Sequence, residues 1–178
     1  NGIPLSAESP CRTGGFVFYY REPGQEPSIP FAEEILYQDD HILVADKPHC
    51  LPVTPSGRFL RETLLVRLKK QLKLEHLVPL HRIDRETAGL VVFSHNLASR
   101  GDYASLFRTR KVSKIYEALA PPLPGGRFPI TYRSCLARGE PFFRMKEIDA
   151  VPNSETIIDV VKKVGPTVLY HLIPVTGR

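Results

Sequence analysis

Hydrophobic residues recur at two different spacings along this chain, and each spacing predicts a different kind of element. In segments 61–73 and 98–108 they recur every three to four positions, which predicts two amphipathic helices. Short apolar runs at 42–45 and 89–93 predict buried strands. Segment 112–119 has period 2, which is typical of a strand with two different faces. We predict further strands at 16–20, 156–161 and 167–174.

The order of these elements predicts the fold class. Strands and helices interleave without a strict βαβ rhythm, which favours an α+β fold with a mixed, mainly antiparallel sheet flanked by helices. Residues 1–30 hold one strand and a Pro/Gly/Glu-rich linker, whereas residues 31–178 belong to one larger domain. The sequence ends at Arg178 inside a strand-to-loop passage, so we expect this domain to be truncated at its C-terminus.

Composition narrows the class of protein. With 42% hydrophobic and 24% charged residues, the 178-residue chain has the balance of a soluble globular domain. No apolar run approaches the roughly 20 residues of a membrane span, so no membrane partner is expected. The cysteines (Cys11, Cys50 and Cys135) are odd in number and far apart, which fits neither a disulfide framework nor a structural zinc site. We therefore expect a reducing, cytoplasmic location.

Asp84 is the residue with the clearest candidate chemistry. It lies between Arg82 and Arg85 in a polar loop that leads into the strand 89–93. Adjacent cations favour the ionised carboxylate, which could then act as a nucleophile. Thr87 and Gly89 would let the chain turn tightly and present this carboxylate at the edge of the sheet. A surface ion pair is the commoner use of such a residue, and local chemistry alone leaves both readings open.

Four elements in sequence order resemble a known family. The string 81–90, His-Arg-Ile-Asp-Arg-Glu-Thr-Ala-Gly-Leu, resembles the His-Arg-Leu-Asp-x-x-Thr-Ser-Gly-Leu signature of the RluA family of RNA pseudouridine synthases. The segments 46–48, 114–118 and 176–178 resemble its Asn/Asp-Lys-Pro, Lys-x-Tyr-x-Ala and Thr-Gly-Arg elements. Ala88 replaces the usual serine and removes one hydroxyl, a change worth on the order of 1 kcal/mol.

The resemblance implies an activity, a partner and roles for individual residues. It implies isomerisation of uridine to pseudouridine in structured ribosomal or transfer RNA, by a monomer that needs neither cofactor nor metal. Asp84 would be the nucleophile, and Tyr116 would stack on the target base. Arg178 would pair with Asp84 and hold it ionised. Residues 31–178 would then be the N-terminal part of the catalytic domain.

The same resemblance gives Arg82 a separate role. An enzyme that reacts with a base in folded RNA must first extract it from the stack, and Arg82 would fill the vacated space. A phosphate contact or an ion pair with Asp84 is the alternative. The predicted RNA-contacting residues, which would supply salt-dependent affinity, are Arg82, Arg85, Arg108, Arg110, Lys111 and Lys114. The residues with a predicted structural role near the site are Lys47, His81, Thr87 and Gly89.

Some alternatives stay open at this point. The formal charge of +5 is by itself a weak sign of a polyanionic partner. The basic side of the helix 61–73, with Arg67, Lys69, Lys70 and Lys73, could contact phosphates or simply face solvent. Residues 1–30 could be the tail of an S4-like RNA-binding domain or an extra strand. A noncatalytic RNA-binding module is one rival function, and a hydrolase that uses His81 and Asp84 is another, although it lacks a third ligand.

Overall fold

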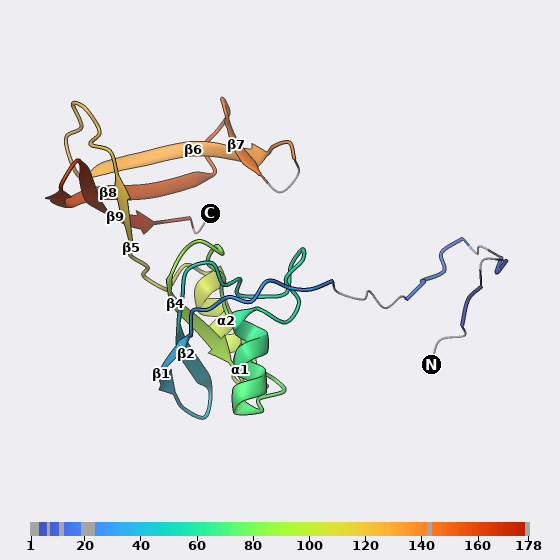
Figure 1. Ribbon diagram of the computed structural model, residues 1–178. Coiled ribbons are helices and arrows are strands. Elements are labelled where there is room, and N and C mark those ends of the chain that lie inside the picture. The colour runs from blue at the N-terminus through green and yellow to red at the C-terminus, as the bar shows by residue number, and fades with distance from the viewer. Residues whose placement is uncertain (1–3, 7, 11–12, 19–23, 142–143, 177–178) are drawn as a thin grey trace. The chain divides into compact units, whose positions relative to one another are not determined.

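A computed structural model describes residues 4–6, 8–10, 13–18, 24–141 and 144–176. The contacts divide the chain into two compact units, Asn1–Asn96 and Leu97–Arg178 (Figure 1). Each described unit has a sheet of its own, and all of the pairings within these sheets are antiparallel. The α+β class and the mainly antiparallel sheet are thus confirmed.

The first unit is a four-stranded sheet with one helix beside it (Figure 1). Its strand order is β1-β2-β4-β3, so the two buried strands predicted from the sequence pair at its centre. The elements are β1 (Glu34–Gln38), β2 (Ile42–Lys47), α1 (Leu64–Leu72), β3 (Val78–Pro79) and β4 (Gly89–Ser94).

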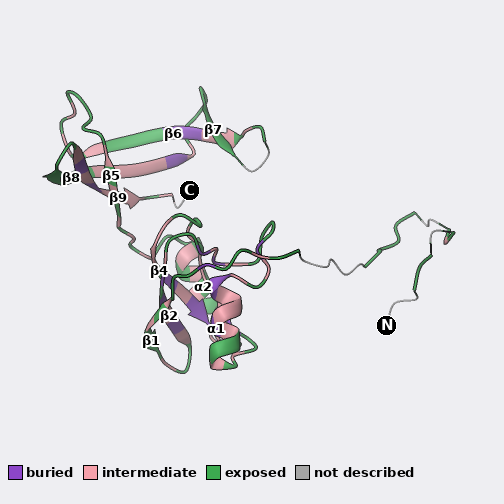
Figure 2. Cartoon of the chain, in the orientation of Figure 1, coloured by how far each residue is buried: buried purple, intermediate pink, exposed green. Residues whose placement is uncertain are grey.

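The core of the first unit joins one face of this sheet to α1. Alternate residues of β2 and β4 point into it, and Leu64 and Leu68 of α1 are fully buried against them. Figure 2 shows buried positions in purple on the strands of this sheet. Each fully buried aliphatic side chain contributes about 1.5–3 kcal/mol. The helix begins where the Thr63 hydroxyl accepts a hydrogen bond from the Val66 N–H, and it ends at Lys73 in a left-handed conformation.

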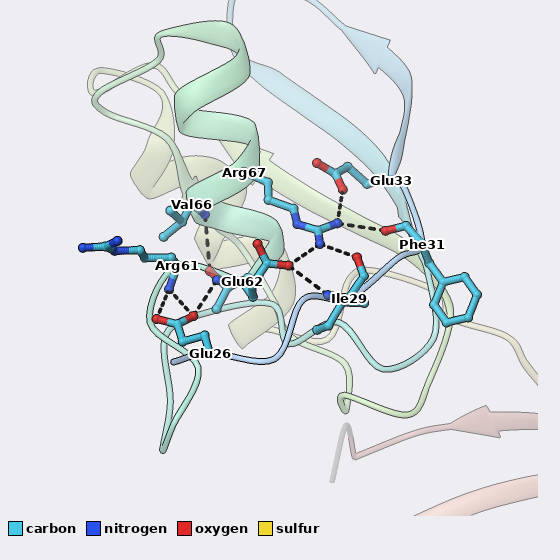
Figure 3. A network of polar contacts seen from close by, with 9 residues as sticks. Glu26, Ile29, Phe31, Glu33, Arg61, Glu62, Val66 and Arg67 are labelled. Atoms are coloured by element: carbon cyan, nitrogen blue, oxygen red, sulfur yellow. Dashed lines mark hydrogen bonds and ion pairs between the residues drawn. The ribbon is translucent and has the colours of Figure 1, made fainter. Parts of the chain in front are cut away.

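A polar network centred on Arg67 attaches the chain before β1 to helix α1 (Figure 3). The Arg67 guanidinium donates to the carbonyl oxygens of Ile29 and Phe31, both at 2.8 Å, and forms ion pairs with Glu33 and Glu62. The hydrogen bond from Arg67 lowers the pKa of Glu62. The Arg67 side chain is therefore used in contacts within the unit. Neither of the two alternatives considered for it, a phosphate contact and a position facing solvent, applies.

Glu26 extends this network to the loop before α1 (Figure 3). Its carboxylate accepts hydrogen bonds from the backbone N–H groups of Arg61, at 2.8 Å, and Glu62, at 2.9 Å. These bonds, led by the one from Glu62, lower the pKa of Glu26. A negative charge ahead of α1 also complements the partial positive charge of a helix N-terminus.

The second unit is a five-stranded antiparallel sheet preceded by a helix. The strand order is β5-β9-β8-β6-β7, and β6 and β8 run side by side (Figure 1). Cys135, Val168 and Tyr170 supply its buried apolar residues. The elements are α2 (Arg100–Arg108), β5 (Tyr116–Ala120), β6 (Ile130–Arg138), β7 (Met145–Ile148), β8 (Ser154–Val164) and β9 (Thr167–Pro174).

Two strand predictions were wrong in part. Residues 16–18 have no regular secondary structure, and Phe16 and Phe18 are almost fully exposed, while Tyr19 and Tyr20 lie outside the described residues. Residues 112–115 alternate in burial as predicted but are not paired, and β5 begins only at Tyr116. No described helix is long and apolar enough to cross a membrane. Of the described cysteines, Cys50 and Cys135 are both free thiols.

Candidate active site

Asp84 lies in the loop that connects β3 to β4, and its side chain is exposed. The loop turns tightly here, because the Thr87 N–H donates to the Asp84 carbonyl at 3.2 Å. Among the described residues, none forms a hydrogen bond or an ion pair with the Asp84 carboxylate. The ion pair considered as an alternative for Asp84 is thus not found within the described part of the chain.

The two arginines beside Asp84 have different environments. Arg85 donates to the Glu86 carboxylate at 2.7 Å, and its guanidinium lies over the Phe59 ring, 5.6 Å from the ring centre. This hydrogen bond lowers the pKa of Glu86. Arg82 is exposed and has no ion pair with any described residue. Arg82 is therefore the freer cation of the two.

Lys47, the last residue of β2, fixes the loop from below the surface. Its side chain is fully buried, and Nζ donates to the carbonyl oxygens of Pro48 at 2.9 Å, Leu51 at 2.7 Å and Arg85 at 3.1 Å. Burial lowers the pKa of Lys47, and the nearby negative groups, including Asp84, oppose that shift. Lys47 thus links the Asp-Lys-Pro turn to the residue next to Asp84.

His49 provides a second anchor that the sequence did not point to. Its Nδ1 lies 2.8 Å from the Glu86 carbonyl oxygen, at hydrogen-bonding distance. Together, Lys47 and His49 hold two consecutive carbonyl groups just after Asp84. His49 follows the Asp-Lys-Pro element by one position, but no periodicity or motif marks a histidine there as a loop anchor.

Gly89 and His81 lie at the two ends of the same loop. Gly89 has a φ of 126°, a conformation that side-chain-bearing residues rarely adopt, and it pairs with Lys47 as β4 begins. His81 Nε2 accepts a hydrogen bond from the Val92 N–H at 3.2 Å. Both contacts tie the loop to the sheet.

The remaining predicted site residues belong to the second unit. Tyr116 is the first residue of β5, half-buried and paired with Leu172 of β9. Lys114 is half-buried two positions earlier, while Arg108, Arg110 and Lys111 are exposed at and after the end of α2. Arg178 lies outside the described residues.

The structure therefore brings the predicted residues together as two groups. The first group lies in or beside the loop between β3 and β4 of the first unit and consists of Lys47, His81, Arg82, Asp84, Arg85, Thr87 and Gly89. The second group, in the second unit, lies between the end of α2 and the start of β5. Within the described residues, no three His, Cys, Asp or Glu side chains form a cluster that could hold a metal ion.

Comparisons with known proteins identify the family. A family model described as RNA pseudouridylate synthase matches residues 41–178. An uncharacterized RNA pseudouridine synthase of Synechocystis is 35% identical over 122 residues, which cover 68% of this chain and 42% of that protein. The tRNA pseudouridine(31) synthase of Saccharomyces cerevisiae is 38% identical over 95 residues, covering 53% of this chain and 22% of that protein. The chain thus spans less than half the length of these relatives.

Solved structures agree with this result. Human RNA pseudouridylate synthase domain containing 4 superimposes with a TM-score of 0.62 at 28% identity, covering 82% of this chain and 60% of that one. Human RNA pseudouridylate synthase domain containing 1 gives a TM-score of 0.70 at 22% identity, covering 86% of this chain and 64% of that one, and shows the fold alone. The chain therefore belongs to the RNA pseudouridylate synthase family, and its motifs are of the RluA type.

Proposed function

We propose that this chain isomerises uridine to pseudouridine in structured ribosomal or transfer RNA, with Asp84 as the nucleophile. The observation that carries the proposal is the state of Asp84, whose exposed carboxylate forms no hydrogen bond or ion pair with a described residue while the backbone just after it is held by Lys47 and His49. A nucleophile that is fixed at its backbone and free at its reacting group is prepared for attack.

The proposed reaction balances without a cofactor. The bond between N1 of uracil and C1′ of the ribose breaks, and a bond between C5 and C1′ forms. The proton on C5 leaves and N1 gains one, so substrate and product are isomers. Asp84 forms a transient covalent bond to the substrate while the base turns, and this bond breaks again before the product leaves, so the carboxylate is regenerated. In this proposal Tyr116 stacks on the base and takes part in removing the C5 proton. Arg178, which lies outside the described residues, is the residue that would pair with Asp84 during the reaction.

Arg82 acts in the step that precedes the covalent reaction, in which the target base leaves its stack. A base in folded RNA leaves its stack at a cost of about a few kcal/mol, and a side chain that occupies the gap reduces this cost. Arg82 is exposed, is two residues from Asp84 and has no ion pair with any described residue. Its planar guanidinium can stack between bases or contact a phosphate.

Charge distribution supports RNA as the partner. Basic residues outnumber acidic ones in segment 97–178, whereas the first unit is nearly balanced. The positive excess therefore lies mainly in the unit that contains Tyr116, Arg108, Arg110, Lys111 and Lys114. Contacts of this kind supply salt-dependent affinity for a phosphate backbone.

The test is tritium release from ribosomal and transfer RNA transcripts labelled at C5 of uridine. We expect release with the wild-type chain and with Asp40→Asn, a matched control that changes an exposed carboxylate in the turn between β1 and β2. Asp84→Asn keeps the shape of the side chain, removes its charge and should reduce release to background.

Each outcome decides something. Equal release from wild type and Asp84→Asn would refute the role of Asp84. RNA binding without release from any of the three proteins would favour the noncatalytic RNA-binding module. Loss of release in Asp40→Asn as well would show that a general change of charge, and not the nucleophile, is being measured.

A further inference from the structure

A cavity of about 250 Å³ lies in the second unit, lined by the end of α2, the segment after it and the end of β9. It opens where β5 and β9 separate. Their last pair is Tyr116 with Leu172, and the same register would place Ile115 opposite Ile173 and then Lys114 opposite Pro174. Proline has no N–H to donate, so the ladder stops and residues 112–114 become a wall of the cavity.

The lining of the cavity combines apolar walls with cations. Phe107, Val112 and Ile173 supply apolar surface, and Arg110 and Lys114 supply two positive charges. Neither cation forms an ion pair or a side-chain hydrogen bond with a described residue. Sites that bind single-stranded nucleic acid combine apolar surface, which contacts a base, with cations, which bind a phosphate. This cavity has both.

Two hydroxyl groups complete the polar part of the lining, those of Ser113 and Thr176. The Thr176 hydroxyl oxygen accepts a hydrogen bond from the Glu155 N–H at 3.1 Å, so its own proton is still available to an acceptor such as a phosphate oxygen. The cavity is smaller than the about 300–1,000 Å³ of drug-sized ligand sites, which suits a single nucleotide.

The backbone of Arg110 ends helix α2 in a conformation that is unusual for a residue with a side chain. The N–H of Arg110 donates to the Phe107 carbonyl at 3.2 Å, and the N–H of Lys111 donates to the Leu106 carbonyl at 2.8 Å. This is the Schellman arrangement, in which the residue at the position of Arg110 is usually glycine. Arg110 has a φ of 58°, which glycine adopts more easily than arginine. Arginine is less favourable than glycine at this helix end, and it places a cation at the cavity.

We propose that this cavity binds one nucleotide of the RNA strand, with the phosphate on Arg110 and Lys114 and the base against Phe107, Val112 and Ile173. The proposal rests on the proposed function for the identity of the ligand as RNA, but it does not involve the chemistry of Asp84. Because the carbonyls of Leu106 and Phe107 already accept hydrogen bonds, they oppose a bound phosphate less than free helix-end carbonyls would.

The experiment measures binding of a fluorescein-labelled oligouridylate to the full chain by fluorescence anisotropy over a series of salt concentrations. We expect Arg110→Gly and Lys114→Gln each to weaken binding about three- to tenfold and to lower the salt slope by about one. The matched control is Lys163→Gln, which removes an exposed charge of β8 outside the cavity and should change affinity less than about twofold.

A second readout separates binding from folding. Glycine relieves the strain at position 110, so the thermal midpoint of Arg110→Gly should equal or exceed that of the wild type even though its binding is weaker. A third arm compares the oligouridylate with an abasic strand of the same length. Tighter binding of the oligouridylate, with the difference lost in Phe107→Ser, would support a seat for the base.

Wild-type affinity and slope in Arg110→Gly would overturn the proposal, as would equal losses in Lys163→Gln and the cavity variants. Equal affinity for the abasic strand would overturn the base seat in favour of a phosphate contact alone. Tritium release by the wild type, measured in parallel, keeps the two proposals apart. Release with unaltered binding by the cavity variants refutes the cavity alone, and no release with weakened binding refutes the proposed function alone.

Discussion

Replacing Lys47 with methionine should destabilise the first unit by about 2–4 kcal/mol. Methionine fills a similar volume but donates no hydrogen bond. The Leu51 carbonyl then loses its partner in a buried position, which costs about 1–3 kcal/mol. The carbonyls of Pro48 and Arg85 are only partly buried and can bind water instead, so each adds less. Relief from burying an ammonium group offsets part of this loss.

The pH dependence has a definite sign. Burial lowers the pKa of Lys47 below its ordinary value of 10.5, so the unfolded chain binds this proton more tightly than the folded one. Stability therefore rises with pH between the lowered pKa and 10.5, because the unfolded state holds more protons in that window. Below the window both states are protonated, and the difference between wild type and Lys47→Met should be constant.

The assay is urea unfolding followed by circular dichroism, at a series of pH values from neutral to alkaline. Lys70→Met, which alters an exposed residue of α1, is the matched control and should change the free energy of unfolding by less than about 0.5 kcal/mol. A loss below about 1 kcal/mol in Lys47→Met would refute the reasoning, since a buried carbonyl group would then have been orphaned at almost no cost. A pH-independent difference up to pH 10.5 would refute the assigned pKa direction.

Two further predictions concern the first unit. Gly89→Ala should lower the free energy of unfolding in urea by about 1–3 kcal/mol, because a φ of 126° is strained for alanine even though no atom lies within 4 Å of the added methyl group. The control Gly101→Ala, in helix α2 with open space around it, should be neutral or stabilising. Equal effects of the two substitutions would contradict the role of backbone strain at Gly89. Arg67→Met should cost about 1–3 kcal/mol near neutral pH, after allowance for partial exposure of the ion pairs. The lowered pKa of Glu62 contributes stability that is fully present above pH 4.5 and is lost as pH falls from 4.5 through the lowered pKa. The difference in free energy of unfolding between wild type and Arg67→Met should therefore shrink over that interval. A difference independent of pH would count against the ion pair of Arg67 with Glu62.

The elements with strong periodicity were predictable from the sequence, because their burial is local. Helix α1 carries Leu64 and Leu68 on one side, and the centres of β2 and β4 are continuous apolar runs. Strands β8 and β9 were predicted as separate segments, although β8 extends beyond the predicted segment 156–161 on both sides and its pairing with β9 was not predicted.

Other elements depend on partners that are distant in sequence. Strands β1, β3, β6 and β7 were missed. Most residues of β1 and β7 are exposed, β3 has only two residues, and β6 mixes exposed and buried positions without a regular alternation. The apolar segment 16–18 failed in the opposite way, because strand-forming residues make a strand only where a neighbouring strand can pair with them. The early end of the β5 ladder required knowledge of its register against Pro174.

The candidate site was only partly predictable. The motif around Asp84 singled out the loop, but its local chemistry suggested an ion pair that none of the described residues provides. Arg85 pairs with Glu86 instead, which no spacing argument predicts. A structural role for Lys47 was predicted from the resemblance. Its contact with Arg85, 38 residues away, and the contact of His49 with Glu86, 37 residues away, appear only in the folded structure.

The network around Arg67 determines where the chain could be cut, or joined to another domain, without disturbing the first unit. Within the described residues, positions before Glu26 make no hydrogen bond to the rest of the first unit, whereas Glu26, Ile29 and Phe31 each do. A gene fusion or a proteolytic cut ahead of Glu26 would therefore leave this unit intact, and one after Phe31 would remove three attachment points at once. Appended domains could be exchanged at the first position over evolutionary time without disturbing the loop that carries Asp84.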